Sequence, residues 1–385
     1  MKIYLDYNAT SPVLPAVRAA VEPILFDSPQ APTGNPSSIH WAGQNAKRKL
    51  EEARAQVARA FGRKPSEVIF TSGGTEADHL ALFGVLLHPT QKHRRLLISA
   101  VEHPAVRAAA AALQQRHGVQ VVELPVDAQG QLDLLALEAA LQIPTGLVSV
   151  MAVNNETGIV SPLPAITERV KRAGALLHVD AVQAIGRVPL PEVDLLSFSG
   201  HKLGGLPGAG VLLTKQPIPL QEQLHGGPQE RGRRAGTEAL APIVGLAVAL
   251  THALSRQTIE MERLQVLRDR LEDMLRELPG VERVGAQAPR VASTSTALFE
   301  GVDGDALLQA LDLEGIAASS GSACSSGSLE PSHVLLAMGV PPRSALAAVR
   351  FSLGWGTTAA EIDTLCQVLP RALAQVRAAA GTRRT

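Results

Sequence analysis

Residues 68–76 read VIFTSGGTE: an apolar run, two adjacent glycines and the start of a helical pattern. A short apolar run bounded by glycine is typical of a buried strand that turns tightly into a helix. Backbone N–H groups at such a turn can point at an anion, and the Thr75 hydroxyl adds a donor at the helix start. The segment predicts a strand–turn–helix unit with a phosphate-binding turn, although such a turn is a weak signal when it stands alone.

The same alternation continues on both sides of this unit. Apolar runs that predict strands lie at residues 68–70, 96–98, 119–124, 147–150, 176–179, 195–198 and 210–213. Helical patterns lie between several of these runs, and the pattern over residues 43–61 places its apolar residues on one face. The alternation predicts an α/β fold with a mostly parallel sheet that helices cover on both faces. In such sheets ligands bind at the carboxyl ends of the strands.

A chain of 385 residues exceeds what a single hydrophobic core usually supports. A long amphipathic pattern over residues 261–278 predicts a helix that leads into a second domain. We expect a large domain over residues 14–256. We expect a smaller α+β domain built from residues 1–13 and 257–385.

Composition excludes several classes of protein. The formal net charge is +0, which gives no electrostatic footprint for a nucleic acid or an anionic membrane. The hydrophobic content of 45% and charged content of 19% are ordinary for a soluble globular protein. Neither a membrane span nor a signal peptide is predicted, so we expect a cytoplasmic protein.

The chain has only two cysteines, Cys324 and Cys366, so a disulfide framework is not expected. Cys366 lies in an apolar helical pattern, which predicts a buried, inert thiol. Cys324 lies in ASSGSACSSGS, residues 318–328. This composition predicts a mobile loop over about residues 318–330 and an accessible thiol.

A lysine and an aspartate follow two further predicted strands. Lys202 stands between glycines in SFSGHKLGG, where partial desolvation would lower its pKa and suit it to a Schiff base. Asp180 could keep the pyridine nitrogen of a pyridoxal cofactor protonated. Taken singly, a solvated loop lysine and a helix N-cap would explain them. The phosphate turn, the aspartate and the lysine occur in that order, each after its own strand, and together they predict a pyridoxal-phosphate site.

Other side chains at strand ends could complete this site. Gln183 could donate to the phenolic oxygen of the ring, and Ser199 and His201 could bind the phosphate. His103 could stack on the ring and move protons, or it could only cap the next helix.

At these residues the sequence resembles the NifS/IscS-like cysteine desulfurases, in the class-V branch of the fold-type-I aminotransferase superfamily. The matching stretches are YLDYNATSP, GNPSSIH, FTSGGTEADHL, VEHPAV, VNNETG, HVDAVQ, SFSGHK, HGGPQERGRRAGT, SSGSACSSGSLEPS and RFSLG. They run from residue 4 to residue 354, so the resemblance covers nearly the whole chain. It implies the fold of a fold-type-I transferase that depends on pyridoxal 5'-phosphate.

The resemblance also implies a role for each matched residue. Lys202 would hold pyridoxal 5'-phosphate as a Schiff base, and Arg350 and Asn155 would bind the substrate, L-cysteine. Thr237 would reach the phosphate of the second subunit in a homodimer with shared active sites. The implied cofactor-binding set is Thr75, Glu76, Asn155, Asp180, Gln183, Ser199, His201, Lys202 and Thr237. No metal is expected.

The cysteine loop selects the reaction among the many that pyridoxal enzymes catalyse. We predict that Lys202 removes the α proton, that the Cys324 thiolate attacks the substrate sulfur, and that reprotonation through His103 releases alanine. The persulfide on Cys324 would pass to an acceptor protein, either an iron–sulfur scaffold or a tRNA-thiolation enzyme, and the sequence does not choose between them. Another class-V reaction, by an aminotransferase or a selenocysteine lyase, is the first alternative. A sulfur-transfer scaffold without turnover is the second.

Overall fold

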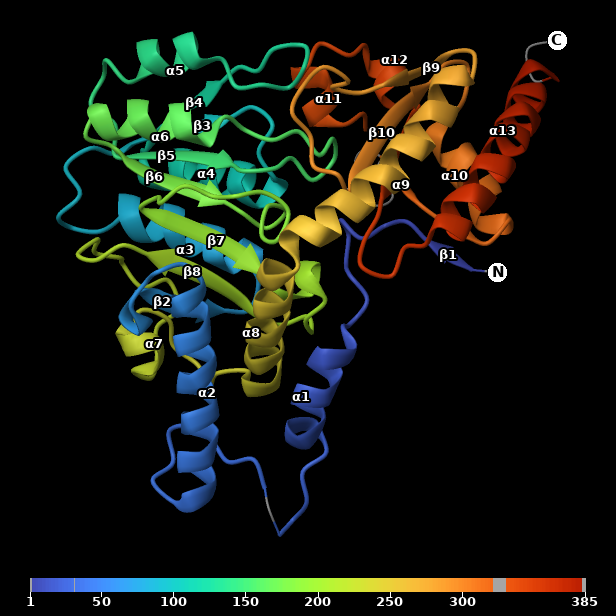
Figure 1. Cartoon of the computed structure of the whole chain (residues 1–385). Helices are drawn as coiled ribbons and strands as arrows, with labels where there is room; N and C mark the ends of the chain where they lie inside the picture. The colour runs from blue at the N-terminus through green and yellow to red at the C-terminus, as the bar shows by residue number, and fades with distance from the viewer. Residues whose placement is uncertain (1, 31, 321–329, 383–385) are drawn as a thin grey trace.

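The structure is a computed structural model that describes residues 2–30, 32–320 and 330–382 (Figure 1). Its central sheet has seven strands in the order β2-β8-β7-β6-β5-β3-β4. The strands are β2 (Val68–Thr71), β3 (Arg95–Ser99), β4 (Gln120–Leu124), β5 (Leu147–Met151), β6 (Leu176–Asp180), β7 (Leu195–Ser199) and β8 (Gly210–Thr214). Only β8 is antiparallel to its neighbours, so the predicted mostly parallel α/β sheet is confirmed.

Helices pack on both faces of this sheet because successive strand residues point to opposite sides. Val68 and Phe70 join the core on one face, whereas Ile69 joins the core on the other. The first face is covered by α2 (Trp41–Ala60), α5 (Leu134–Ala140), α6 (Leu163–Arg172) and α8 (Leu240–Ser255). The second is covered by α3 (Gly74–Leu86) and α4 (Pro104–His117). Among the described residues, no helix has both the length and the apolar character that a membrane crossing requires.

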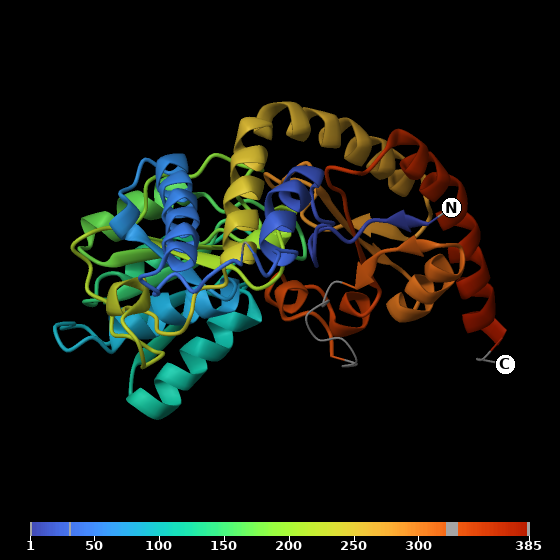
Figure 2. The same cartoon turned by 90° about the horizontal axis from the view of Figure 1, so that it is seen from below.

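The C-terminal part begins with α9 (Gln257–Glu277), which leads away from α8 (Figure 2). An antiparallel sheet follows in the order β12-β13-β10-β9, made of β9 (Val281–Arg283), β10 (Thr294–Phe299), β12 (Ser319–Ser320) and β13 (Ala348–Ser352). Its helices are α10 (Gly304–Leu313), α11 (His333–Ala337), α12 (Pro342–Ala345) and α13 (Ala359–Thr382). The N-terminal β1 (Ile3–Tyr4) pairs in parallel with β11 (Ile316–Ala317).

A second hydrophobic core lies in this part. Ile3 and Leu5 belong to it together with apolar residues of α9, α10 and α13, apart from the core around the large sheet. These separate cores support the proposed division into residues 14–256 and residues 1–13 with 257–385.

The cysteine segment begins later than predicted. The loop was expected from about residue 318, but Ser319 and Ser320 form β12 and pair with Arg350 and Val349 of β13. Their backbone groups bond to a sheet edge, which Ser/Gly composition does not reveal. Cys324 itself lies outside the described residues.

Residues 5–14 form an irregular segment with a turn at residues 7–9, the N-terminal strap, that runs from β1 towards α1 (Pro15–Leu25) (Figures 1 and 2). At one end the carbonyl of Leu5 accepts from the N–H of Ser352, at 2.8 Å. At the other end the Ser11 N–H donates to the carbonyl of His201, at 3.0 Å. The strap therefore connects β13 to the 3-10 turn Gly200–Leu203, which carries Lys202.

Candidate active site

A cavity of about 270 Å³ opens at the carboxyl ends of β5, β6 and β7, whose last residues Met151, Asp180 and Ser199 line it. The parallel strands bring residues from distant segments to this one edge. The predicted site residues that line the cavity are Thr75, His103, Asn155, Asp180, Gln183, Ser199, His201, Lys202 and Arg350.

The amine of Lys202 enters the cavity from the turn after β7. Its Nζ donates to the carbonyls of Asn8 and Ala9 in the N-terminal strap, each at 2.6 Å. Gly204 ends the turn with a φ of 87°, and an added Cβ would lie 2.7 Å from the Leu14 side chain. Only glycine fits both constraints, so the glycine beside Lys202 fixes the backbone that presents the amine.

Asp180 is a buried carboxyl at the end of β6. Burial raises its pKa to about 6, and the Val182 N–H and the nearby Lys202 amine oppose that rise. Asp78, on α3, lines the same cavity. Burial and repulsion from Asp180 raise the pKa of Asp78 well above its usual value, against the hydroxyl of Ser197. A cationic ring nitrogen placed against Asp180 would favour its charged form, because an opposite charge offsets the cost of burial.

The glycine turn before α3 faces the same cavity. Gly74 lies so close to the segment after β6 that an added Cβ would lie 2.8 Å from Cγ2 of Val182. No side chain among the described residues caps this 13-residue helix at its N-terminus, and its first residues Gly74 and Thr75 line the cavity with Ser199 and His201. Burial and the Lys202 charge lower the pKa of His201 to about 4, so its imidazole is neutral. This donor set fits a phosphate group.

His103 caps a helix and also lines the cavity. Its Nδ1 accepts from the Ala105 N–H at 3.1 Å and caps α4, and the ring also lines the cavity. Burial and the Lys202 charge lower its pKa to about 4. A neutral ring of this kind can stack on an aromatic cofactor.

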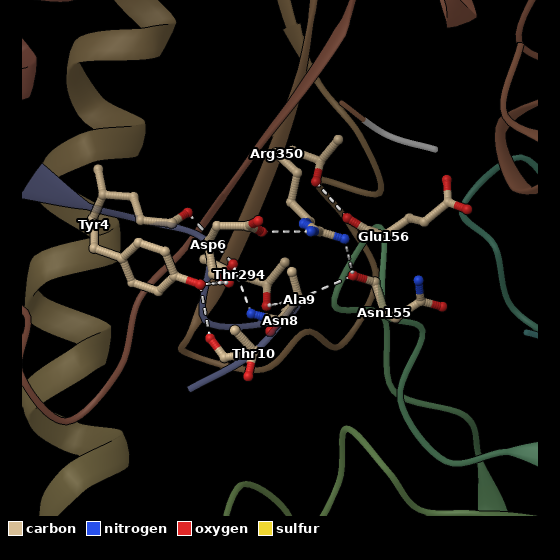
Figure 3. A network of polar contacts seen from close by, with 12 residues as sticks. Tyr4, Asp6, Asn8, Ala9, Thr10, Asn155, Glu156, Thr294 and Arg350 are labelled. Atoms are coloured by element: carbon tan, nitrogen blue, oxygen red, sulfur yellow. Dashed lines mark hydrogen bonds and ion pairs between the residues drawn. The ribbon is translucent and has the colours of Figure 1, made fainter. Parts of the chain in front are cut away.

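Arg350 is 1% exposed and belongs to β13. Its Nη2 donates to Oδ1 of Asp6 at 2.7 Å, and its Nη1 donates to the carbonyl of Asn155 at 2.9 Å (Figure 3). Its buried Nε has no hydrogen-bond partner within the part of the chain that the structure describes. A buried, unpaired donor on a cavity-lining guanidinium fits a carboxylate ligand.

Two predicted residues, Glu76 and Thr237, do not line this cavity. Glu76 supports the phosphate turn from outside the cavity: it accepts from the Ser72 N–H at 2.8 Å and pairs with Arg234 at 2.7 Å. Thr237 is exposed and does not line the cavity of its own chain. Cys324 falls outside the described residues, and Cys366 is half-buried against the second core.

Comparison with known proteins places this geometry in a family. The model of the class-V aminotransferase family matches residues 3–365. This chain belongs to the class-V aminotransferase family. A cysteine desulfurase of Cereibacter sphaeroides is 44% identical over 98% of this chain and 97% of its own length. An IscS-like cysteine desulfurase of Mycobacterium tuberculosis is 42% identical over 98% of both chains. A solved NifS-like protein superposes with a TM-score of 0.90 at 34% identity, covering 97% of this chain and 100% of its own.

Class-V aminotransferases depend on pyridoxal 5'-phosphate, and the residues present fit that group. The glycine turn with Ser199 and His201 suits its phosphate, the buried Asp180 suits its ring nitrogen, and the Lys202 amine lies in the same cavity. The fit rests on the chemistry and burial of these donors together.

Several residues in and around this class-V site carry no recognisable motif in the sequence. Asn8 and Asp6 come from the strap, which has no periodic pattern to mark it. Asp78 and Arg187 lie within helical or turn segments, where a lone charge is normally read as solvated. The match of YLDYNATSP was the one signal that pointed to the strap.

Proposed function

We propose that this chain is a pyridoxal-phosphate-dependent cysteine desulfurase that converts L-cysteine to L-alanine and carries the sulfur as a persulfide on Cys324. One observation carries the proposal. The Lys202 amine, the Asp180 carboxyl and the Arg350 guanidinium line a single cavity, which two anchored segments connect to the cysteine loop. The desulfurase names of the similar proteins support it.

In this proposal Lys202 holds the cofactor, Asp180 pairs with the ring nitrogen and Gln183 contacts the phenolic oxygen. Thr75, Ser199 and His201 bind the phosphate, with Glu76 behind the turn. When bound, the cofactor supplies a protonated ring that accepts the electron pair left at the substrate α carbon. Burial of Asp180 within the sheet excludes water from the pair that it would form.

Arg350 and Asn155 would bind and orient the substrate. The guanidinium is fixed before substrate arrives, because Asp6 and the Asn155 carbonyl each hold one of its nitrogens. A substrate carboxylate can then take the remaining donors, and prior ordering reduces the entropy lost on binding. Lys202 is suited to carry the α proton, since its amine lies in the cavity beside His103. His103 as the proton donor stays a prediction, because its depressed pKa leaves the ring neutral.

The sulfur step uses the loop that begins after β12. Ser320 is paired with Val349 of β13, next to Arg350, and Cys324 follows four residues later in the sequence. On the far side of the loop, the Ser332 hydroxyl donates to Glu156 and the His333 ring contacts the carbonyl of Glu102, at 2.9 Å. Both loop ends are therefore anchored beside the cavity.

The proposed transfer balances. The Cys324 thiol and L-cysteine become the Cys324 persulfide and L-alanine. The Cβ–S bond of the substrate breaks and a sulfur–sulfur bond forms. The sulfur atom is oxidised as the carbon is reduced and takes a proton, so no external oxidant is needed.

The homodimer is also a proposal. Thr237 is exposed in the single chain, so a second copy could contact it. The large apolar side chains of Phe26, Ile39 and Trp41, at 80%, 91% and 62% exposure, are available for burial by a second copy. The sulfur acceptor, an iron–sulfur scaffold or a tRNA-thiolation enzyme, and a cytoplasmic location stay predictions.

The first test is alanine formation from L-cysteine by the cofactor-loaded protein without any keto acid. We expect alanine from the wild type and from Cys366→Ser, and none from Cys324→Ser, which should still bind the cofactor. Substantial alanine from Cys324→Ser would contradict the role of that residue. A need for a keto acid would favour an aminotransferase, and activity on selenocysteine alone would favour a selenocysteine lyase.

A further inference from the structure

We propose that Arg187 is a positioning residue that fixes the amide orientations of Gln183 and Asn8, and through them the donors offered to the cofactor and the substrate. The inference rests on the proposed function, because it assigns the ring contact to Gln183. Neither motif nor mechanism above gives Arg187 a task.

Arg187 follows Gln183 by four residues, in the turn after β6. A single nitrogen, Nη1, donates to Oε1 of Gln183 at 2.8 Å and to Oδ1 of Asn8 at 2.9 Å. A guanidinium has no acceptor, so the atom that faces it in each amide must be oxygen. Arg187 therefore holds the oxygen of both amides on its own side, and the NH2 groups of Gln183 and Asn8 point away from it.

For Gln183 the consequence lies inside the cavity. Its Nε2 donates one hydrogen to the Asn8 carbonyl at 2.9 Å. The side chain lines the cavity, so the second hydrogen on Nε2 is available to a ligand. That hydrogen suits an anionic oxygen such as the phenolate of the ring. The opposite orientation would turn Oε1 towards the phenolate and replace attraction by repulsion.

For Asn8 the consequence concerns its neighbours Asn155 and Arg350, the proposed substrate contacts (Figure 3). Its Nδ2 donates to the Asn155 carbonyl at 3.1 Å and to Oγ1 of Thr294 at 3.0 Å. The same Asn155 carbonyl accepts from Arg350, at 2.9 Å. A flipped Asn8 would set two oxygens against each other there and would loosen the carbonyl that holds the Arg350 fork.

Placing the Arg187 charge here is unfavourable, which supports a specific role for this residue. Burial and repulsion from Arg350 lower the pKa of Arg187 to about 10, so it is still a cation at neutral pH. Among the described residues no carboxylate lies within ion-pair distance of Arg187, and its two hydrogen-bond partners, Gln183 and Asn8, are neutral amides. Arg187 is partly buried and lines a second cavity, so holding its charge there without a counter-ion has a cost that an apolar residue would not have.

The test is a pH titration of the absorption band of the bound cofactor, which needs no turnover. A donor to the phenolic oxygen stabilises its ionised form and lowers the midpoint. We expect Arg187→Met to raise the midpoint by about one pH unit or more, the worth of a hydrogen bond to a charged group. Arg187→Lys, also a donor-only cation, should shift it less. Gln183→Glu should raise it with Arg187 in place, because an ionised carboxylate offers no donor.

Arg256, an exposed arginine, lines a neighbouring cavity together with Arg187 and provides the matched control. Arg256→Met should leave the midpoint unchanged. An unshifted midpoint in Arg187→Met beside a raised one in Gln183→Glu would overturn the role of Arg187 and leave the ring contact standing. An unshifted Gln183→Glu would overturn both. A wild-type protein that binds no cofactor would contradict the proposed function itself. If Arg187→Met does not fold, Arg187→Glu serves, since an acceptor-only side chain should reverse the amides and raise the midpoint at least as far.

Discussion

The side chain at position 350 must offer several donors in one plane, as a guanidinium does, if it binds a substrate carboxylate while it also contacts Asp6 and the Asn155 carbonyl. We expect Arg350→Lys to raise the KM for L-cysteine about 10- to 100-fold with a smaller change in kcat, because a lysine cannot keep these contacts and a parallel pair of donors. Steady-state alanine formation measures both constants. Arg371→Lys, at an exposed position of α13, is the control. A loss confined to kcat would contradict a ground-state role for Arg350.

Glu156 is the buried carboxyl that receives the Ser332 hydroxyl at the end of the cysteine loop. Burial raises its pKa from 4.5 to about 7, and Ser332 and Arg350 oppose that rise. The folded protein then holds a proton that the unfolded chain releases above pH 4.5. Stability from this group is present below the unfolded value and falls as the pH rises to about 7.

Glu156→Gln should therefore be more stable than the wild type at pH 8, by at most about 3 kcal/mol, with the difference shrinking towards pH 5. The glutamine keeps an acceptor for Ser332 but cannot ionise. Urea unfolding at the two pH values measures the difference. A difference of the same size at both would show that the ionisation of Glu156 does not matter.

At the scale of single elements, a buried ion pair between Arg54 and Glu230 holds the segment that precedes Thr237. Glu230 and Arg231 have φ values of 48° and 61°, a left-handed conformation that costs about 1–3 kcal/mol per residue outside glycine. The Glu230 carboxylate accepts from Arg54 at 2.7 and 2.8 Å and from the Phe70 N–H at 3.0 Å. These contacts pin the short helix α7 (Gln229–Gly232) against β2 and hold the strained backbone in place.

Glu230→Gln should lower the free energy of unfolding by about 3 kcal/mol, because the buried Arg54 loses its buried charge partner and keeps only the exposed Glu51, at 3.1 Å. Glu52→Gln breaks the exposed pair of Arg48 and Glu52, and should cost less than about 0.5 kcal/mol. Chemical denaturation of both variants checks the contrast. Equal effects would mean that the buried pair does not hold the segment.

Elements with a strong local pattern could be predicted from the sequence. The strands of the large sheet are runs of buried apolar residues, and α2 and α9 carry clear amphipathic patterns, so each was found within a few residues of its ends. The strand β12 and the N-terminal strap could not be predicted, because backbone hydrogen bonds to residues far away in the chain fix their conformation. Ser319 pairs with Arg350, and Tyr7 donates to Ser352, at 3.2 Å.

In the site, too, residues next to a local sequence pattern could be predicted and residues that depend on long-range contacts could not. Lys202, Asp180 and the glycine turn follow apolar strands and could be predicted in place. Arg187 and Asn8 could not, because what they do depends on which amide atoms face each other in three dimensions.

Across the whole molecule, the proposed homodimer with shared active sites predicts complementation between two inactive variants. In a mixed dimer of Lys202→Ala and Thr237→Ala protomers, one site loses both residues and the other keeps both. We expect each parent to be weak or inactive, and the mixture, after exchange of subunits, to approach half of the wild-type activity per mixed dimer. Alanine formation after co-refolding measures it. A mixture no more active than its parents would contradict an across-dimer role for Thr237.

The most direct measurement asks where the sulfur goes. The cofactor-loaded protein is given one equivalent of L-cysteine and its peptides are weighed, and the chain offers only two thiols to compare. The account predicts one extra sulfur atom on the peptide that contains Cys324, formed together with alanine, and none on the peptide that contains Cys366. Alanine without sulfur on Cys324, or sulfur found on Cys366 instead, would contradict it.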